Sequence, residues 1–162
     1  MALASFFMIN AHAPARAGSL QLSDAAPGKP LSMKFKAVDG REVDLAKLQG
    51  KVVLIDFWAT WCGDCRAELP NVKAAYEKLH PKGFEIIAIS FDQKKRDLQS
   101  LIAKEQLPWP QYFDGLSWDN KIGKKYGIEA LPAMWLIDKS GKLRDTQAQQ
   151  DLAGRVEKLL AE

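Results

Sequence analysis

The chain has 162 residues, which suits one domain with a sizeable buried core, and its hydrophobic share of 47% excludes both a disordered chain and a membrane bundle. The net charge of +3 is small, and no Lys/Arg run is interleaved with aromatic residues, so nucleic acid is excluded as a main partner. Two cysteines cannot staple a small scaffold, and alone they do not identify a cellular compartment.

Residues 1–27 have the composition of a leader followed by a linker. Ala2 to Ile9 is a short apolar run, and Ala15-Arg16-Ala17 is typical of a secretory cleavage site, but the first Lys or Arg is Arg16, so a basic start is missing. We expect a partial signal, or the remnant of an anchor or upstream domain. The signal-like half favours export to the periplasm or cell envelope, and a cytoplasmic location stays open.

The next segment predicts a β-hairpin. Apolar residues alternate on either side of Asp39-Gly40, a dipeptide typical of hairpin turns. The alternating residues are Met33, Phe35 and Ala37 before the turn and Val43 and Leu45 after it.

The stretch from Val52 to Pro70 predicts a buried strand followed by a helix. Val52 to Phe57 is β-branched and almost wholly apolar, with Asp56 as its one charged residue. Helical spacing begins after Trp61, which puts Cys62 at or just before a helix N-terminus. The dipole at that end of a helix stabilises a thiolate, and Cys65 lies one turn further on, where it can close a disulfide.

The remaining chain alternates between predicted strands and helices. A second buried strand is expected over Phe84 to Phe91, and Leu98, Leu101 and Ile102 mark an amphipathic helix. Further elements are a short strand within Pro108 to Phe113, a strand over Ala133 to Ile137, a last strand near Leu143 and a closing helix from Leu152 to Leu160.

These motifs resemble a known group of proteins. Asp-Phe-Trp-Ala-Thr-Trp followed by Cys-Gly-Asp-Cys resembles the thioredoxin superfamily, and Glu-Leu-Pro after Cys65 with the long Asp92 to Tyr126 region resembles the TlpA/ResA-type thiol-disulfide oxidoreductases. The resemblance implies that residues 28–162 form one α/β domain. Its expected fold is a thioredoxin-like three-layer sandwich with a central mixed sheet, an N-terminal β-hairpin extension and an inserted helix-strand segment.

The resemblance also implies roles for the residues around the cysteines. Cys62 would attack a client disulfide and Cys65 would resolve the mixed disulfide, so the redox-active disulfide is the only cofactor expected. Asp56 matches the buried aspartate that relays a proton, and burial would raise its pKa towards neutrality. Glu68 matches a second active-site carboxylate, with a solvent-facing helix position as the equal alternative. Ala88 stands where thioredoxin has a lysine beside that aspartate.

Substrate contacts are expected around the same motif. The resemblance makes Leu131-Pro132 a cis peptide bond facing the cysteines, whose backbone pairs with an incoming chain. Trp61 would offer apolar contact beside Gly63 and Asp64, the residues between the cysteines. The other tryptophans, Trp58, Trp109, Trp118 and Trp135, are expected in the core.

The direction of reaction follows from the charge between the cysteines. Asp64 disfavours the Cys62 thiolate and so predicts a reductant, with a potential on the order of thioredoxin's −270 mV. The resemblance implies exported client proteins, such as apocytochrome c before haem attachment or a copper site in an oxidase, with electrons from a membrane thiol reductase. We expect a monomer.

Three other functions would require different residues. A peroxidase of the peroxiredoxin type would have Pro and Thr where this chain has Ile55 and Ala59. A copper-delivery protein could use both cysteines but would need a third ligand, and the only histidines are His12 and His80. A non-catalytic scaffold is disfavoured because both cysteines and both candidate bases are present.

Overall fold

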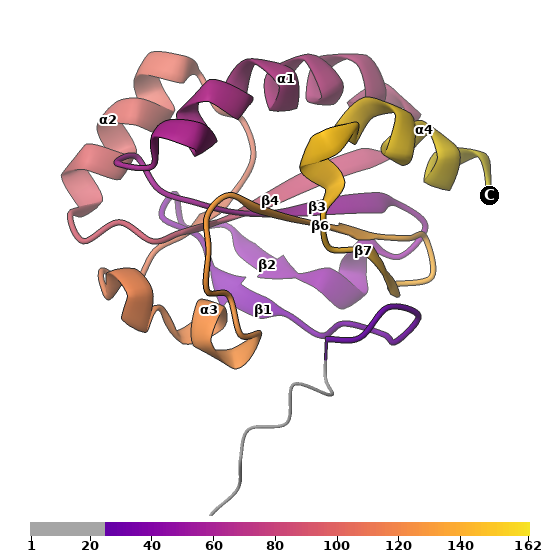
Figure 1. The fold of residues 1–162 in the computed structure, drawn as a ribbon, viewed down its shortest axis with the longest axis horizontal. Coiled ribbons are helices and arrows are strands. Elements are labelled where there is room, and N and C mark those ends of the chain that lie inside the picture. The colour runs from indigo at the N-terminus through magenta and orange to yellow at the C-terminus, as the bar shows by residue number, and fades with distance from the viewer. Residues whose placement is uncertain (1–24) are drawn as a thin grey trace, which may run out of the picture.

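The computed structural model describes residues 25–162, and apart from its last three residues the leader expected over 1–27 lies outside them. The core is a five-stranded mixed sheet in the order β5-β4-β3-β6-β7 (Figure 1). Strands β3, β4 and β5 run parallel, whereas β6 and β7 join antiparallel. The bounds are β3 Val52–Trp58, β4 Phe84–Ser90, β5 Gln111–Tyr112, β6 Ala133–Ile137 and β7 Leu143–Asp145.

Strands β3 and β4 form the centre of the hydrophobic core. Every residue of β3 is buried, and β4 is buried at all but one position. Both strands are covered on both faces, which explains their continuous apolar sequence and agrees with the prediction. Within residues 25–162, no helix is both long and apolar enough to cross a bilayer.

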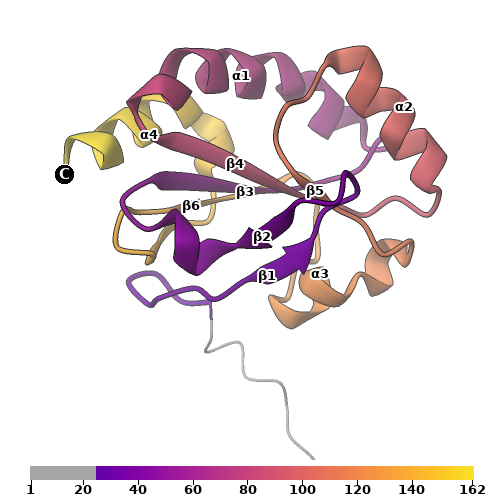
Figure 2. The same cartoon turned by 180° about the vertical axis from the view of Figure 1, so that it is seen from behind.

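Helices and a hairpin cover the two faces of the sheet. The helices are α1 Gly63–Leu79, α2 Lys95–Glu105, α3 Lys121–Lys125 and α4 Leu152–Ala161, and the hairpin strands are β1 Lys34–Lys36 and β2 Glu42–Asp44. Helices α1 and α4 pack together on one face, and the hairpin and α3 lie on the other (Figures 1 and 2). The thioredoxin-like fold, its hairpin extension and the inserted segment α2 to β5 are therefore confirmed.

One prediction about the core is wrong. Trp58, Trp109 and Trp135 are buried as expected, but Trp118 is 45% exposed. It lies in a short 3₁₀ turn, Ser117–Asp119, at the surface between β5 and α3. A turn outside the sheet has no second layer to cover it, so part of the indole remains in solvent.

Candidate active site

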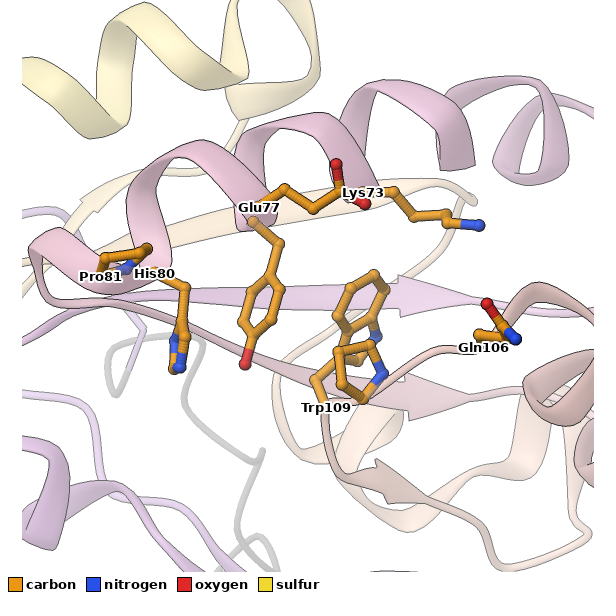
Figure 3. Close-up of a pocket in the computed structure, with 8 residues that line it drawn as sticks. Lys73, Glu77, His80, Pro81, Gln106 and Trp109 are labelled. Atoms are coloured by element: carbon orange, nitrogen blue, oxygen red, sulfur yellow. The ribbon is translucent and has the colours of Figure 1, made fainter.

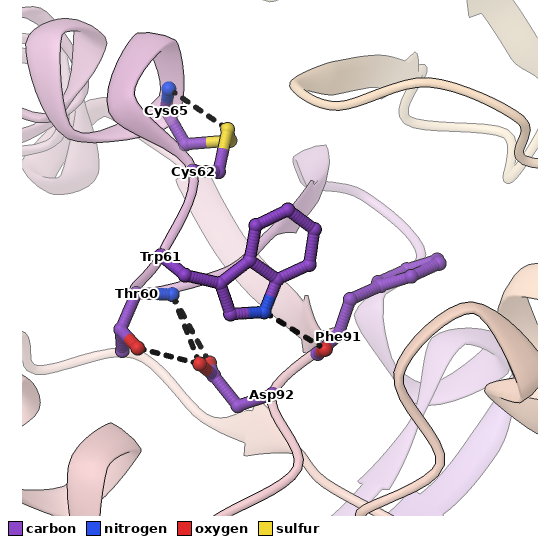
Figure 4. Close-up of a disulfide and its surroundings, with 6 residues drawn as sticks. All are labelled: Thr60, Trp61, Cys62, Cys65, Phe91 and Asp92. Atoms are coloured by element: carbon purple, nitrogen blue, oxygen red, sulfur yellow. Dashed lines mark hydrogen bonds between the residues drawn. A yellow bond between two sulfur atoms is a disulfide. The ribbon is translucent and has the colours of Figure 1, made fainter.

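The two cysteines lie where strand β3 gives way to helix α1. Cys62 is the N-cap of α1, and its sulfur accepts a hydrogen bond from the backbone N–H of Cys65 at 3.2 Å (Figure 4). The side chains are joined in a disulfide. Cys62 is 7% exposed and Cys65 4%, so the predicted order of exposure holds but the difference is small. A sulfur at this N-cap is placed where N–H groups stabilise a thiolate.

A buried carboxylate holds the loop that leads into Cys62. Asp92, just after β4, accepts hydrogen bonds from the backbone N–H of Thr60 at 3.1 Å and from its hydroxyl at 2.5 Å (Figure 4). The Ser90 hydroxyl donates to the same carboxylate at 2.7 Å. Asp92 is not among the site residues predicted from the sequence. The available signal was an acidic residue directly after a buried strand of a parallel sheet, at the edge where loops meet.

Asp56 is a buried acid in the middle of β3. Its partners in register are Ala88 on β4 and Met134 on β6, and both are fully buried apolar residues. Among the described residues, its Oδ1 atom has no hydrogen-bond partner. Desolvation, with a smaller contribution from the negative charge of Glu68, raises the pKa of Asp56 to about 7. The expected shift towards neutrality is confirmed.

Glu68 lies one turn after Cys65 on α1 and is half-buried. Its carboxylate accepts a hydrogen bond from the Asn71 side chain at 2.8 Å. Because its charge raises the pKa of Asp56, the two carboxylates interact electrostatically. The fold therefore brings together both acids that the sequence predicted, although they come from a strand and a helix.

The loop before β6 lies at the same end of the sheet as Cys62. The Leu131-Pro132 peptide bond is cis, as expected, and both residues are half-buried. The next residue, Ala133, pairs with Phe57 near the end of β3 that leads to Cys62. The antiparallel arrangement of β3 and β6 thus puts the start of one strand beside the end of the other.

The surface around the disulfide is partly apolar. Trp61 is 52% exposed, and Gly63 and Asp64 are exposed in the first turn of α1. A hollow of about 500 Å³ lies beside this turn, between α1 and α2. It is lined by Gly63, Arg66, Ala67, Leu69, Pro70, Leu101 and Glu105.

A separate pocket of about 220 Å³ lies along the second half of α1, away from the cysteines (Figure 3). It is lined mainly by Tyr76, His80, Pro108 and Trp109, and it contains none of the predicted site residues. The Tyr76 and His80 rings stack with centroids 4.5 Å apart. Burial raises the pKa of the Tyr76 hydroxyl, and no cysteine lines the pocket.

Copper binding by the two cysteines would need a third ligand beside them. Among residues 25–162, no three His, Cys, Asp or Glu side chains gather into a group that could hold a metal ion. His80 Nδ1 donates a hydrogen bond to Phe84 O at 3.0 Å near the far end of α1, and His12 lies outside the described residues. A third ligand for a copper ion is therefore not brought to the cysteines by the described part of the fold.

Comparisons with known proteins agree with this geometry. Residues 23–146 match the model of the AhpC/TSA family. The thiol-disulfide oxidoreductase ResA of Bacillus thuringiensis (strain Al Hakam) is 33% identical over 126 residues, which span 75% of this chain and 71% of that protein. Tryparedoxin of Trypanosoma brucei brucei is 37% identical over 111 residues, or 67% of this chain and 76% of that protein.

A solved structure shares the fold. The crystal structure of the thioredoxin domain of a thiol-disulfide oxidoreductase from Bacteroides vulgatus aligns with a TM-score of 0.74 and 29% identity, over 83% of this chain and 98% of that one. The fold, the Cys62-Cys65 disulfide and these relatives point the same way. The chain therefore belongs to the AhpC/TSA family of the thioredoxin superfamily and is a ResA-like thiol-disulfide oxidoreductase.

Proposed function

We propose that this protein reduces disulfide bonds in exported client proteins. The observation that carries the proposal is the position of Cys62 as N-cap of α1, disulfide-bonded to Cys65 and adjoining the exposed Trp61. A sulfur there can ionise, reach a partner and be resolved by its neighbour one turn away.

The reaction is a thiol-disulfide exchange in two steps. In the reduced protein, the Cys62 thiolate attacks a client disulfide, forming a mixed disulfide and releasing one client thiolate. Cys65, deprotonated, then attacks Cys62 and releases the second client thiolate. The client gains two electrons, and the protein ends with the Cys62-Cys65 disulfide.

The second step requires a base, because the Cys65 thiol is buried and burial disfavours its thiolate. We assign this role to Asp56, whose pKa of about 7 suits proton transfer near neutral pH. Glu68 tunes that pKa and is a second candidate for the proton path. Leu131 and Pro132 would pair with the extended client backbone, with Trp61, Gly63 and Asp64 bordering it.

The cellular setting completes the proposal. We place the protein in the cell envelope as a monomer that receives electrons from a membrane thiol reductase. Support comes from the signal-like composition of the leader and from relatives named ResA. The peroxidase alternative is disfavoured because Ile55 and Ala59, at the positions of the peroxidase Pro and Thr, are fully buried apolar residues.

A trapping experiment tests the function. Cys65→Ser should accumulate a client as a mixed disulfide on Cys62, and mass spectrometry of an envelope extract should identify it. Cys62→Ser is the matched control and should trap nothing and lose insulin reduction. Insulin reduction that survives in Cys62→Ser would refute the proposed function.

A further inference from the structure

Only three large apolar side chains are exposed in residues 25–162, and they come from two loops at one end of the sheet. They are Trp61 at 52%, Trp118 at 45% and Leu116 at 44%. We call these three side chains the aromatic ledge. Single exposed apolar residues are common in proteins, but a group of them beside a reactive centre indicates an interaction site.

The two indoles of the ledge share one support. The ring centroids of Trp61 and Trp118 are 6.0 Å apart, and Trp118 packs against the ring of Phe91 at 5.4 Å with an edge-on geometry. Phe91 is fully buried, and its backbone oxygen accepts a hydrogen bond from Trp61 Nε1 at 3.4 Å (Figure 4). The residue that follows β4 thus supports both rings.

The segment bearing Trp118 is fixed to the sheet by buried contacts. The Asn120 side chain donates to Ser90 O at 2.9 Å and accepts from Gly123 N–H at 2.8 Å. A Cβ on Gly123 would overlap the Phe91 ring, so the close approach of α3 depends on a glycine. The contacts of Asn120 and Gly123 therefore fix the segment that bears Trp118 against the end of β4.

The size of the ledge decides between possible occupants. About half of two indoles and of one leucine amounts to roughly 300 Å² of accessible apolar surface. A stable dimer buries about 800 Å² on each partner. The ledge is too small for a second copy of this chain, but its area suits one or two side chains of an extended polypeptide. Because Trp61 adjoins Cys62, such a chain would present its disulfide to the reactive sulfur.

We propose that the aromatic ledge selects client segments that have an aromatic or large aliphatic side chain next to the cysteine being reduced. Trp118 is then a specificity-determining residue contributed by the segment between β5 and α3. This inference rests on the proposed function, because the selected segment is a substrate of the Cys62-Cys65 centre.

Two peptides test the inference. Both are short disulfide-linked homodimers of one sequence, with Trp beside the cysteine in the first peptide and Ser in the second. We expect wild-type kcat/KM to favour the Trp peptide by about tenfold, and Trp118→Ala to reduce this preference about fivefold. The ratio within one variant cancels any general loss of activity. Trp118→Phe, which keeps a ring against Phe91, should retain most of the preference.

Two further variants provide a second measurement and a control. Leu116→Ser removes an exposed side chain without disturbing the Phe91 contact, so it gives a second measurement if Trp118→Ala folds poorly; we expect about a twofold smaller preference. Glu77→Ala, an exposed change in the second half of α1, should keep the wild-type ratio.

Three results would overturn the inference. In the first, wild type, Trp118→Ala and Leu116→Ser reduce both peptides with the same ratio of kcat/KM. The ledge then plays no part in selecting the client, and the proposed function stands. A wild-type dimer in sedimentation that Trp118→Ala converts to a monomer makes the ledge a self-association surface instead. Failure of the wild type to reduce either peptide removes the proposed function as well.

Discussion

Asp56 and Ala88 are register partners on β3 and β4, so the buried carboxylate has a methyl group beside it where a cation would lower its pKa. With Met134 on its other side, Asp56 is surrounded by apolar strands. The result is a pKa near 7, which is useful for proton transfer but unfavourable for folding when the group is charged.

The stability of the oxidised protein should depend on Asp56. Its pKa is about 7 in the folded state against 3.8 for an unperturbed group. Between these two pH values, Asp56 is protonated in the folded state and ionised in the unfolded state. The free energy of unfolding should therefore fall as pH rises from 4 to 8, and Asp56→Asn should remove a loss on the order of 4 kcal/mol. Urea unfolding of wild type and Asp56→Asn at pH 4.5 and 8 measures the difference. An equal change in unfolding free energy between the two pH values in both proteins would contradict the prediction.

Glu68→Gln should lower the pKa of Asp56 below its value of about 7, because it removes the negative charge that opposes ionisation. The measurement is a ¹³C NMR titration of the Asp56 carboxyl group. Glu77→Gln makes the same change in charge at an exposed position of α1 and should leave the titration where it is. Equal shifts in both variants would argue against a specific interaction.

The reduction potential should lie near −270 mV, at the reducing end of the superfamily's range. Neutralising the exposed Asp64 stabilises the Cys62 thiolate, so Asp64→Asn should raise the potential by about 10 mV. Equilibration with dithiothreitol buffers measures both values. A potential near −120 mV would make the protein an oxidant and contradict the assigned direction.

Asp92→Ala should cost roughly 2–4 kcal/mol of unfolding free energy, because it leaves the buried Ser90 hydroxyl and the partly buried donors of Thr60 without an acceptor. Asp97→Ala is a matched control, since the Asp97 carboxylate is exposed and its ion pair with the Arg96 guanidinium is long, at 3.9 Å. It should change stability by less than about 0.5 kcal/mol. Similar losses in the two variants would show that the Asp92 network contributes little.

Gly123→Ala should destabilise the protein by about 1–3 kcal/mol, because its Cβ would overlap the fully buried Phe91 ring. Gly63→Ala adds the same methyl group in the first turn of α1, where nothing lies within 4 Å, and should be neutral or stabilising by up to about 1 kcal/mol. Thermal unfolding of the oxidised variants checks both, and equal melting temperatures would contradict the packing argument.

Local patterns were enough to predict the catalytic motif and the order of the strands and of helices α1, α2 and α4. The strand ending at Trp58, the N-cap at Cys62 and the turn at Asp39-Gly40 are each encoded within a few neighbouring residues. Such features depend on side-chain periodicity and on backbone preferences, which a sequence displays directly. Asp56 could be predicted as buried because it interrupts an apolar strand.

Contacts between distant segments were decided only by the tertiary structure. Asp92 supports Thr60, Gly123 fits against Phe91 and Trp118 stands beside Trp61, and each pair is separated by about 30 residues or more in the chain. Core packing, the default expectation for both residues, is right for Trp109 and wrong for Trp118, because exposure depends on which element covers a residue. The sequence by itself determined the chemistry of the disulfide centre, and the packing of the 113–126 segment on the end of β4 determined the surface around it.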